Sequence, residues 1–166
     1  MTKSCQQYRV KGNLLPWLIV VLASVCYAGF VPLAPGTAGT LVAALGSWLA
    51  RGVGLGPYFY GGLVLFVFLL AWWTAGRAEK LFGQSDSPKI VIDEVVGFLV
   101  TMVAIPTTLF YLVSAVILFR IFDILKLFPS RLVLARSSGG LAVVADDVIA
   151  GIYTNLILQL VKHLSL

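Results

Sequence analysis

Charged residues are scarce in this chain. They make up 11% of the 166 residues, whereas 60% are hydrophobic and the mean hydropathy is +0.98. A soluble domain has roughly 25% charged residues, so this composition predicts an integral membrane protein built as one compact helical domain. The net charge is +5. In a membrane protein such a surplus indicates orientation and contact with anionic lipid, and we expect no nucleic-acid partner.

Cysteine and histidine are nearly absent. Two cysteines, Cys5 and Cys26, are a poor basis for a disulfide framework or a thiolate metal site. Neither cysteine begins a Cys-x5-Arg nucleophile loop. The single histidine, His163, lies three residues from the C-terminus, which argues against phosphatases that use a histidine nucleophile. Enzymes that depend on thiol or imidazole chemistry are therefore disfavoured.

Acidic residues are also few, and most of them stand in unusual places. Of seven, five lie inside or at the edge of long apolar runs: Asp93, Glu94, Asp123, Asp146 and Asp147. Such placement is costly unless the acids bind a cation or a polar partner. A favourable interaction with a helix N-terminus explains one acid pair about as well, but two pairs and a fifth acid favour a site. Five carboxylates form an all-oxygen ligand set that suits Mg²⁺ or Mn²⁺ rather than Zn²⁺.

The apolar pattern predicts an all-α fold. Residues 1–13 are expected to be a cytoplasmic tail, and residues 14–166 a single membrane-embedded domain. Prolines and glycines at 32–40 predict a loop, with Thr37 or Thr40 as the N-cap of the next helix. A second loop is expected at 76–89. The expected helices are 41–50, 58–75, 90–105, 107–127 and 141–164.

Basic residues in the loops predict orientation. Arg and Lys gather in 76–89 and 128–140, which places these loops in the cytoplasm. Helix alternation then brings all five misplaced acids towards the cytoplasmic face of a bundle of about four to five spanning helices. The apolar segment 14–33 cannot cross as well without breaking this alternation. We therefore expect it to be a re-entrant or interfacial helix.

Arg120, Asp123 and Lys126 are spaced at i, i+3 and i+6, so they share one broad side of a helix. A simple salt-bridge ladder is one interpretation. The other is an anion site, in which Arg120 and Lys126 hold a phosphate while Asp123 holds a metal. A metal, a phosphate site and a membrane face together indicate phosphoryl chemistry on a lipid.

Four ordered motifs resemble those of the phosphatidylglycerophosphatase A family, over about residues 28–160. They are PGTAGT at 35–40, IVIDEVVG at 90–97, FRIFDILK at 119–126, and GG at 139–140 followed by DDVIAG at 146–151. The resemblance implies an all-helical, Mg²⁺-dependent phosphatase of the bacterial inner membrane. It implies removal of the terminal phosphate of phosphatidylglycerophosphate, giving phosphatidylglycerol.

The resemblance also implies roles for individual residues. Catalytic positions correspond to Asp93, Glu94, Asp123, Asp146 and Asp147, and phosphate-binding positions to Arg120, Lys126, Gly36, Thr37, Gly39 and Thr40. The candidate ligands for the metal, Mg²⁺ or Mn²⁺, are Asp93, Asp123, Asp146 and Asp147, and the hypothesis uses Asp93, Asp123 and one aspartate of the 146–147 pair. Glu94 or the other aspartate of that pair then serves as general base. Water and a carboxylate both remain open as the nucleophile.

Two other functions deserve comparison. A small ion- or proton-coupled transporter would use intramembrane acids as a relay, but its acids would lie at several depths and its sequence would often show paired repeats. A non-catalytic subunit that binds anionic lipid would need the basic loops but not five carboxylates.

Overall fold

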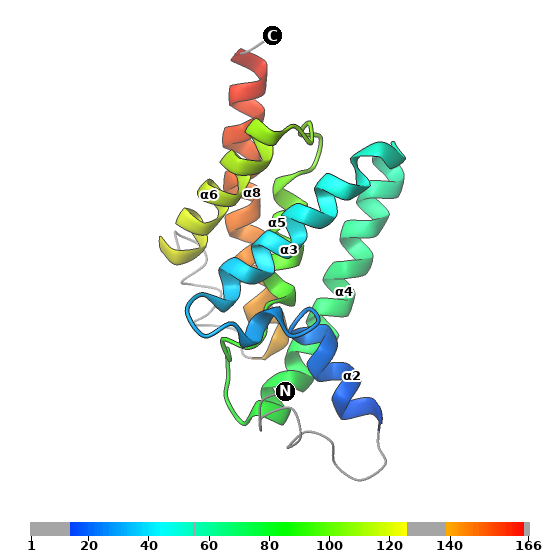
Figure 1. The fold of residues 1–166 in the computed structure, drawn as a ribbon, viewed down its shortest axis with the longest axis vertical. Coiled ribbons are helices and arrows are strands. Elements are labelled where there is room, and N and C mark those ends of the chain that lie inside the picture. The colour runs from blue at the N-terminus through cyan, green and yellow to red at the C-terminus, as the bar shows by residue number, and fades with distance from the viewer. Residues whose placement is uncertain (1–13, 55, 126–138, 165–166) are drawn as a thin grey trace.

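The computed structural model describes residues 14–54, 56–125 and 139–164. Within these ranges it contains six α-helices, two short 3-10 helices and no strand, which confirms the predicted all-α class (Figure 1). The elements are α2 (Leu14–Ala23), η1 (Ala28–Phe30), α3 (Pro35–Ala50), η2 (Arg51–Val53), α4 (Pro57–Phe82), α5 (Ile92–Thr101), α6 (Leu109–Leu125) and α8 (Gly140–Leu164).

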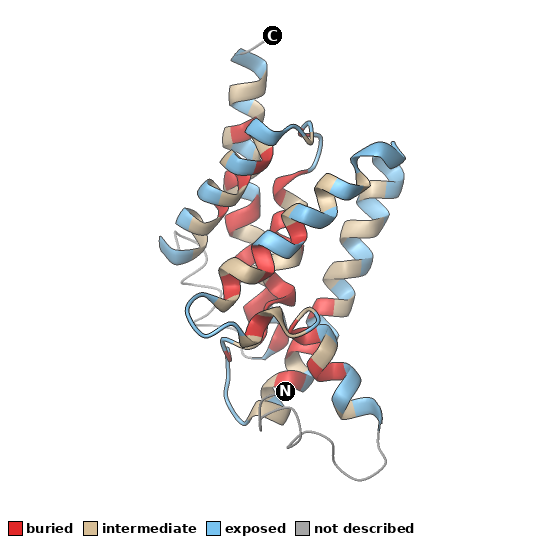
Figure 2. Cartoon of the chain, viewed as in Figure 1, coloured by how far each residue is buried: buried red, intermediate tan, exposed pale blue. Residues whose placement is uncertain are grey.

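Two of the described helices are long and apolar enough to cross a bilayer. These are α4, with 26 residues, and α8, with 25. The most apolar window of α4 is only 17% buried inside the protein, and its outer side shows as exposed surface in Figure 2. A span needs about 20 residues, so α3, α5 and α6 with 16, 10 and 17 residues are shorter than that length. The described part of the chain thus offers two candidate spans, where the sequence predicted four to five.

The apolar segment 14–33 is not one continuous helix. Helix α2 ends at Ala23, and Val25, Cys26 and Tyr27 follow with φ angles of 47°, 52° and 69°. Three consecutive non-glycine residues with positive φ make a tight reversal that leads into η1. Ten helical residues extend about 15 Å, half the hydrocarbon thickness, so α2 is too short to cross by itself. Its re-entrant or interfacial placement stays a prediction.

The expected loop at 32–40 is wrong, because α3 begins at Pro35 and includes the whole PGTAGT motif. Proline is tolerated at the first helical position, where its missing N–H has no helical acceptor. The N-cap residue is Ala34, which makes no side-chain cap, so the predicted capping role of Thr37 or Thr40 is also wrong. Packing explains the helix: a Cβ at Gly39 would lie 2.9 Å from the Cβ of Val91, so the glycine lets α3 approach the start of α5.

The expected loop at 76–89 is shorter than predicted, because α4 continues to Phe82. Gly83 then ends the helix with φ 67°, and its N–H donates to the Glu79 carbonyl. The extension is stabilised by packing, since a Cβ at Gly140 of α8 would overlap the backbone nitrogen of Gly76. Basic residues expected in this loop, Arg77 and Lys80, therefore lie on α4.

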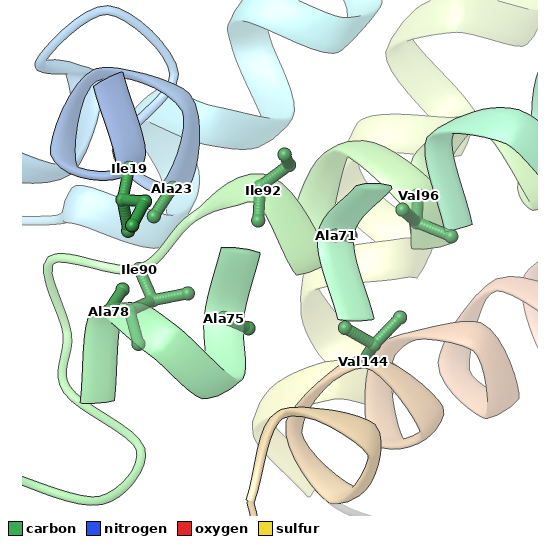
Figure 3. Close-up of a cluster of buried hydrophobic side chains, with 9 residues drawn as sticks. All are labelled: Ile19, Ala23, Ala71, Ala75, Ala78, Ile90, Ile92, Val96 and Val144. Atoms are coloured by element: carbon green, nitrogen blue, oxygen red, sulfur yellow. The ribbon is translucent and has the colours of Figure 1, made fainter. Parts of the chain in front are cut away.

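A hydrophobic cluster joins α2, α4 and the beginnings of α5 and α8. Figure 3 shows its side chains, which come from small and β-branched residues that allow the helices to lie close together: Ile19, Ala23, Ala71, Ala75, Ala78, Ile90, Ile92, Val96 and Val144. A second cluster lies further along α5, where the rings of Phe98 and Phe119 meet edge to face with centroids 6.3 Å apart. The two clusters fix α5 against its neighbours along its whole length.

Helices α5 and α8 cross at a pair of glycines. A Cβ at Gly151 would overlap the Gly97 carbonyl, and a Cβ at Gly97 would lie 2.6 Å from the Asp147 carbonyl. Residues four positions apart share a helix face. Asp93 precedes Gly97 by four residues, and Asp147 precedes Gly151 by four, so the crossing brings the two carboxylates to the same end of the contact.

We expect Gly151→Ala to destabilise the protein, because the added methyl group must separate α5 from α8. Overpacking of this kind lowers the free energy of unfolding by about 1–3 kcal/mol. Gly62→Ala on α4 is the matched control, since a Cβ there meets nothing within 4 Å. Thermal unfolding in detergent, followed by circular dichroism, measures both. Equal midpoints for the two variants would contradict the close contact.

Candidate active site

All five predicted acids come together where α5, α6 and α8 meet. Carboxylate oxygens of Asp93, Glu94 and Asp147 lie within 4.8 Å of one another, and so do those of Asp123, Asp146 and Asp147. Asp147 belongs to both groups. The acids come from the first turn of α5, the last turns of α6 and the second turn of α8. Helix packing therefore joins residues that are more than 50 positions apart in the sequence.

Most of these carboxyl groups are removed from water. Asp93, Asp146 and Asp147 are 6%, 4% and 4% exposed. Asp93 lies on α5, which is not one of the two candidate spans. Burial raises the pKa of its carboxyl to about 6. Burial, and then the charge of Asp93, raise the pKa of Glu94 well above its ordinary value. Carboxylates this close together repel one another unless a cation lies between them.

Arg120 on α6 provides a positive charge beside the acids. Its Nη1 lies 2.7 Å from Asp123 Oδ2 and 3.7 Å from Glu94 Oε1. Nη1 and Nε are both buried, and although Nη1 forms an ion pair with Asp123, neither atom donates a hydrogen bond to the described residues. The guanidinium therefore keeps donors that a bound anion can use.

The first turn of α3 closes one side of the site. A Cβ at Gly36 would overlap Glu94 Oε1 and would lie 2.9 Å from Arg120 Nη1, so any larger residue must displace the ends of these side chains. First-turn N–H groups, such as those of Gly36 and Thr37, have no acceptor inside the helix. A helix N-terminus of this kind favours an anion.

The other predicted phosphate-binding residues are placed differently. Gly39 packs against Val91, and the buried hydroxyl of Thr40 donates to the Gly36 carbonyl over 3.0 Å. Gly39 and the side chain of Thr40 both face the helix packing. Lys126 lies outside the described residues, as do the basic residues of the 128–138 segment.

The positioning glycines Gly97 and Gly151 were missed by the sequence reasoning. A signal for them was present, because each follows a site acid by four residues, as Asp93-x3-Gly97 and Asp147-x3-Gly151. The repeated acid-x3-Gly spacing puts a small residue one turn below each carboxylate on the same helix face. Such a residue permits the close helix approach that the site requires.

The donor set fits a hard divalent cation. Every candidate ligand atom is a carboxylate oxygen, which Mg²⁺ and Mn²⁺ prefer. Two of these oxygens, Asp93 Oδ1 and Glu94 Oε2, are buried without a hydrogen-bond partner in the described structure. Buried acceptors in this condition are costly, and a cation would satisfy them. The acidic cluster can thus hold a metal ion beside an arginine with unused donors.

Comparison with known proteins decides the family. The family model described as PgpA: Phosphatidylglycerophosphatase A matches residues 21–162. The chain belongs to the phosphatidylglycerophosphatase A family. It is therefore a lipid phosphatase of that family, and the resemblance found in the motifs is confirmed.

Curated relatives extend over most of the chain. The phosphatidylglycerophosphatase A of Escherichia coli is 32% identical, covering 89% of this chain and 84% of its own length. The phosphatidylglycerophosphatase A of Haemophilus influenzae is 31% identical, covering 82% of this chain and 83% of its own length. A Bacteroides thetaiotaomicron protein, provisionally named a phosphatidylinositol-3-phosphatase, is 33% identical and covers 88% and 94%. No solved structure matches the chain.

Asp147→Asn should weaken binding of Mn²⁺ more than any other single change among the acids, because Asp147 belongs to both carboxylate groups. We expect a loss of at least about tenfold, the lower end of what altered metal surroundings produce. Isothermal titration calorimetry of the purified protein measures it. Asp86→Asn is the control, since Asp86 lies outside the cluster at φ 48°, a conformation that asparagine tolerates. Equal affinities for both variants would contradict the site.

Gly36→Ala should reduce phosphatase activity while the protein stays folded. The added methyl group would push Glu94 and Arg120 from their positions, and displacements of about 1 Å can cost roughly a hundredfold in rate. Gly46→Ala is the matched control on the same helix, because a Cβ there meets nothing within 4 Å. Phosphate release and the thermal midpoint are measured for both. Full activity in Gly36→Ala would show that the close contact of Gly36 with Glu94 and Arg120 is not needed for catalysis.

Proposed function

We propose that this protein is a Mg²⁺-dependent phosphatase that converts phosphatidylglycerophosphate to phosphatidylglycerol, with Mn²⁺ as an alternative ion. One observation carries the proposal. Buried acceptors without a hydrogen bond, on Asp93 and Glu94, lie beside Arg120, whose buried Nε and Nη1 donate no hydrogen bond although Nη1 forms an ion pair with Asp123. A cation would satisfy the acceptors and a phosphate would satisfy the donors, so the site fits the two ligands bound together.

The acids and the basic groups have separate tasks in this proposal. Asp93, Asp123, Asp146 and Asp147 hold the ion, which when bound polarises the phosphoryl group and offsets its negative charge. Arg120 binds phosphate oxygens through its unused donors, and Asp123 keeps its guanidinium in place. The N–H groups of the first turn of α3 add further donors.

Glu94 is the proposed general base. Its Oε2 has no hydrogen-bond partner among the described residues, and its raised pKa brings the carboxyl closer to the range in which it can accept a proton. The proton comes from the water that attacks phosphorus opposite the leaving alcohol. Gly36 and Arg120 confine the other oxygen of Glu94, so the base is fixed relative to the phosphate.

The terminal phosphate of phosphatidylglycerophosphate is the favoured substrate group because the matched family and two curated relatives carry the corresponding name. The name of the Bacteroides thetaiotaomicron relative suggests phosphatidylinositol 3-phosphate as a second candidate. Both substrates are phosphomonoesters on the headgroup of a diacyl lipid. The cation, Arg120 and the helix N-terminus would bind that phosphate in either lipid.

The proposed location is the bacterial inner membrane, in several passes, with the site at the cytoplasmic face. Helices α4 and α8 supply candidate spans, and the acids gather at one end of the bundle rather than at several depths. That gathering favours a phosphatase over the alternative of an ion- or proton-coupled transporter. The single membrane domain at 14–166 and the tail at 1–13 belong to the same proposal, and residues 1–13 lie outside the described ranges.

A substrate panel tests the proposal. Purified protein in detergent should release phosphate fastest from phosphatidylglycerophosphate, compared with phosphatidylinositol 3-phosphate and phosphatidate. EDTA should abolish release and added Mg²⁺ should restore it. Asp93→Asn should lower kcat/KM by at least about a hundredfold, the scale of losing one group that stabilises transition-state charge.

Asp86→Asn serves as the control for removing an acid outside the cluster. Faster phosphate release from phosphatidylinositol 3-phosphate would identify that lipid as the preferred substrate, and the proposed phosphatase reaction would still hold. Undiminished activity in Asp93→Asn would contradict the assignment of the site.

A further inference from the structure

An apolar groove lies between α3, α4 and α5, away from the acids. Its volume is about 660 Å³. Helix α3 contributes Val42 and Gly46, α4 contributes Tyr60 and Gly61, and α5 contributes Leu99. None of the five site acids lines it, and Arg51 is the one charged residue among its described lining residues.

Two polar side chains of the groove wall are already hydrogen-bonded within the protein. The Tyr60 hydroxyl donates to the Leu99 carbonyl over 2.8 Å, and the Ser47 hydroxyl donates to the Ala43 carbonyl over 2.9 Å. These groups offer little to a polar ligand, so the wall suits a hydrocarbon chain.

Arg51 marks one end of the groove. It lies fifteen residues beyond Gly36, which along a helix is about 22 Å, so this end is remote from the acids. Its guanidinium carbon lies 3.6 Å from the centre of the Trp48 ring. Arginine and tryptophan together are typical of the level where lipid headgroups meet the hydrocarbon.

The length of the groove matches one leaflet. From Val42 to Arg51 the helix rises about 14 Å, close to half of the roughly 30 Å hydrocarbon thickness.

We propose that the groove binds one acyl chain of an anionic phospholipid whose headgroup phosphate pairs with Arg51. This lipid sits in the leaflet opposite the acids and is distinct from the substrate. The charge of Arg51 favours a lipid with net negative charge, and the guanidinium can bind two phosphate oxygens at once. The proposal needs the chain to lie in a bilayer but does not depend on the reaction at the acidic site.

Photolabelling tests the occupant. The protein is placed in phosphatidylcholine nanodiscs with a phosphatidylglycerol probe that carries a diazirine in one acyl chain, and labelled peptides are mapped by mass spectrometry. We expect labels on the groove-lining parts of α3, α4 and α5. Gly61→Leu should reduce them about tenfold, the factor expected when roughly two methylene groups lose burial.

Gly62→Leu is the control. Both glycines are on α4 with open space around an added Cβ, but only Gly61 lines the groove, so both variants should fold. Arg51→Gln should remove the preference for the phosphatidylglycerol probe over a phosphatidylcholine probe, and Arg51→Lys should restore part of it. This readout is independent of phosphate release, so it can fail while the proposed reaction holds.

Three results would overturn the proposal. One is undiminished labelling in Gly61→Leu, and another is an equal loss in Gly62→Leu. The third is a product in which two protein chains, rather than protein and lipid, are joined through the groove, since that would make the groove an interface between copies of the chain.

Discussion

The contact between Gly97 and Gly151 is the constraint on which the site depends. It lets α5 and α8 approach so closely that a Cβ added at either glycine would overlap the other helix. Asp93 and Asp147 lie one turn before this contact. The other acid of each pair, Glu94 or Asp146, is placed by being adjacent to it in the sequence. If the helices separated by the width of a methyl group, the carboxylates would no longer lie close enough to share one cation. The close packing of the helices is therefore what makes a metal site geometrically possible here.

Electrostatics gives the site its second constraint. Five carboxylates and one guanidinium leave an excess of negative charge in a poorly hydrated place. Such an arrangement opposes folding unless a cation is bound or some of the carboxyl groups are protonated, because buried like charges raise one another's free energy. A cation bound among these acids would therefore stabilise the bundle. Arg120 cannot replace it, since its contacts with Asp123 and Glu94 leave the oxygen Asp93 Oδ1 without a partner.

The sequence predicted the gathering of the five acids better than the helix boundaries. The five acids were recognisable because a carboxylate in an apolar run is costly in any fold, whichever helices surround it. The boundaries failed where glycines make tertiary contacts: α3 begins at Pro35 because Gly36 and Gly39 fit against neighbouring elements, and α4 continues past Gly76 because α8 packs on it. Helix propensity alone predicts that these glycines interrupt a helix. Their partners are distant in the sequence, so a single sequence does not reveal the contacts.

Helix α5 raises a final question, because ten residues are too few to cross a bilayer. Its last carbonyls and those of the turn that follows would be exposed to hydrocarbon if nothing satisfied them. Side chains of α8 do so: Asn155 donates to Thr101 and Val103 carbonyls over 2.8 Å, and Lys162 donates to Ala104 over 2.9 Å. One long helix thus supports the short one at both ends, through shared carboxylates at the site and through amide and ammonium donors at the opposite end. A short α5 is what allows two adjacent acids to open a helix without that helix having to span a bilayer.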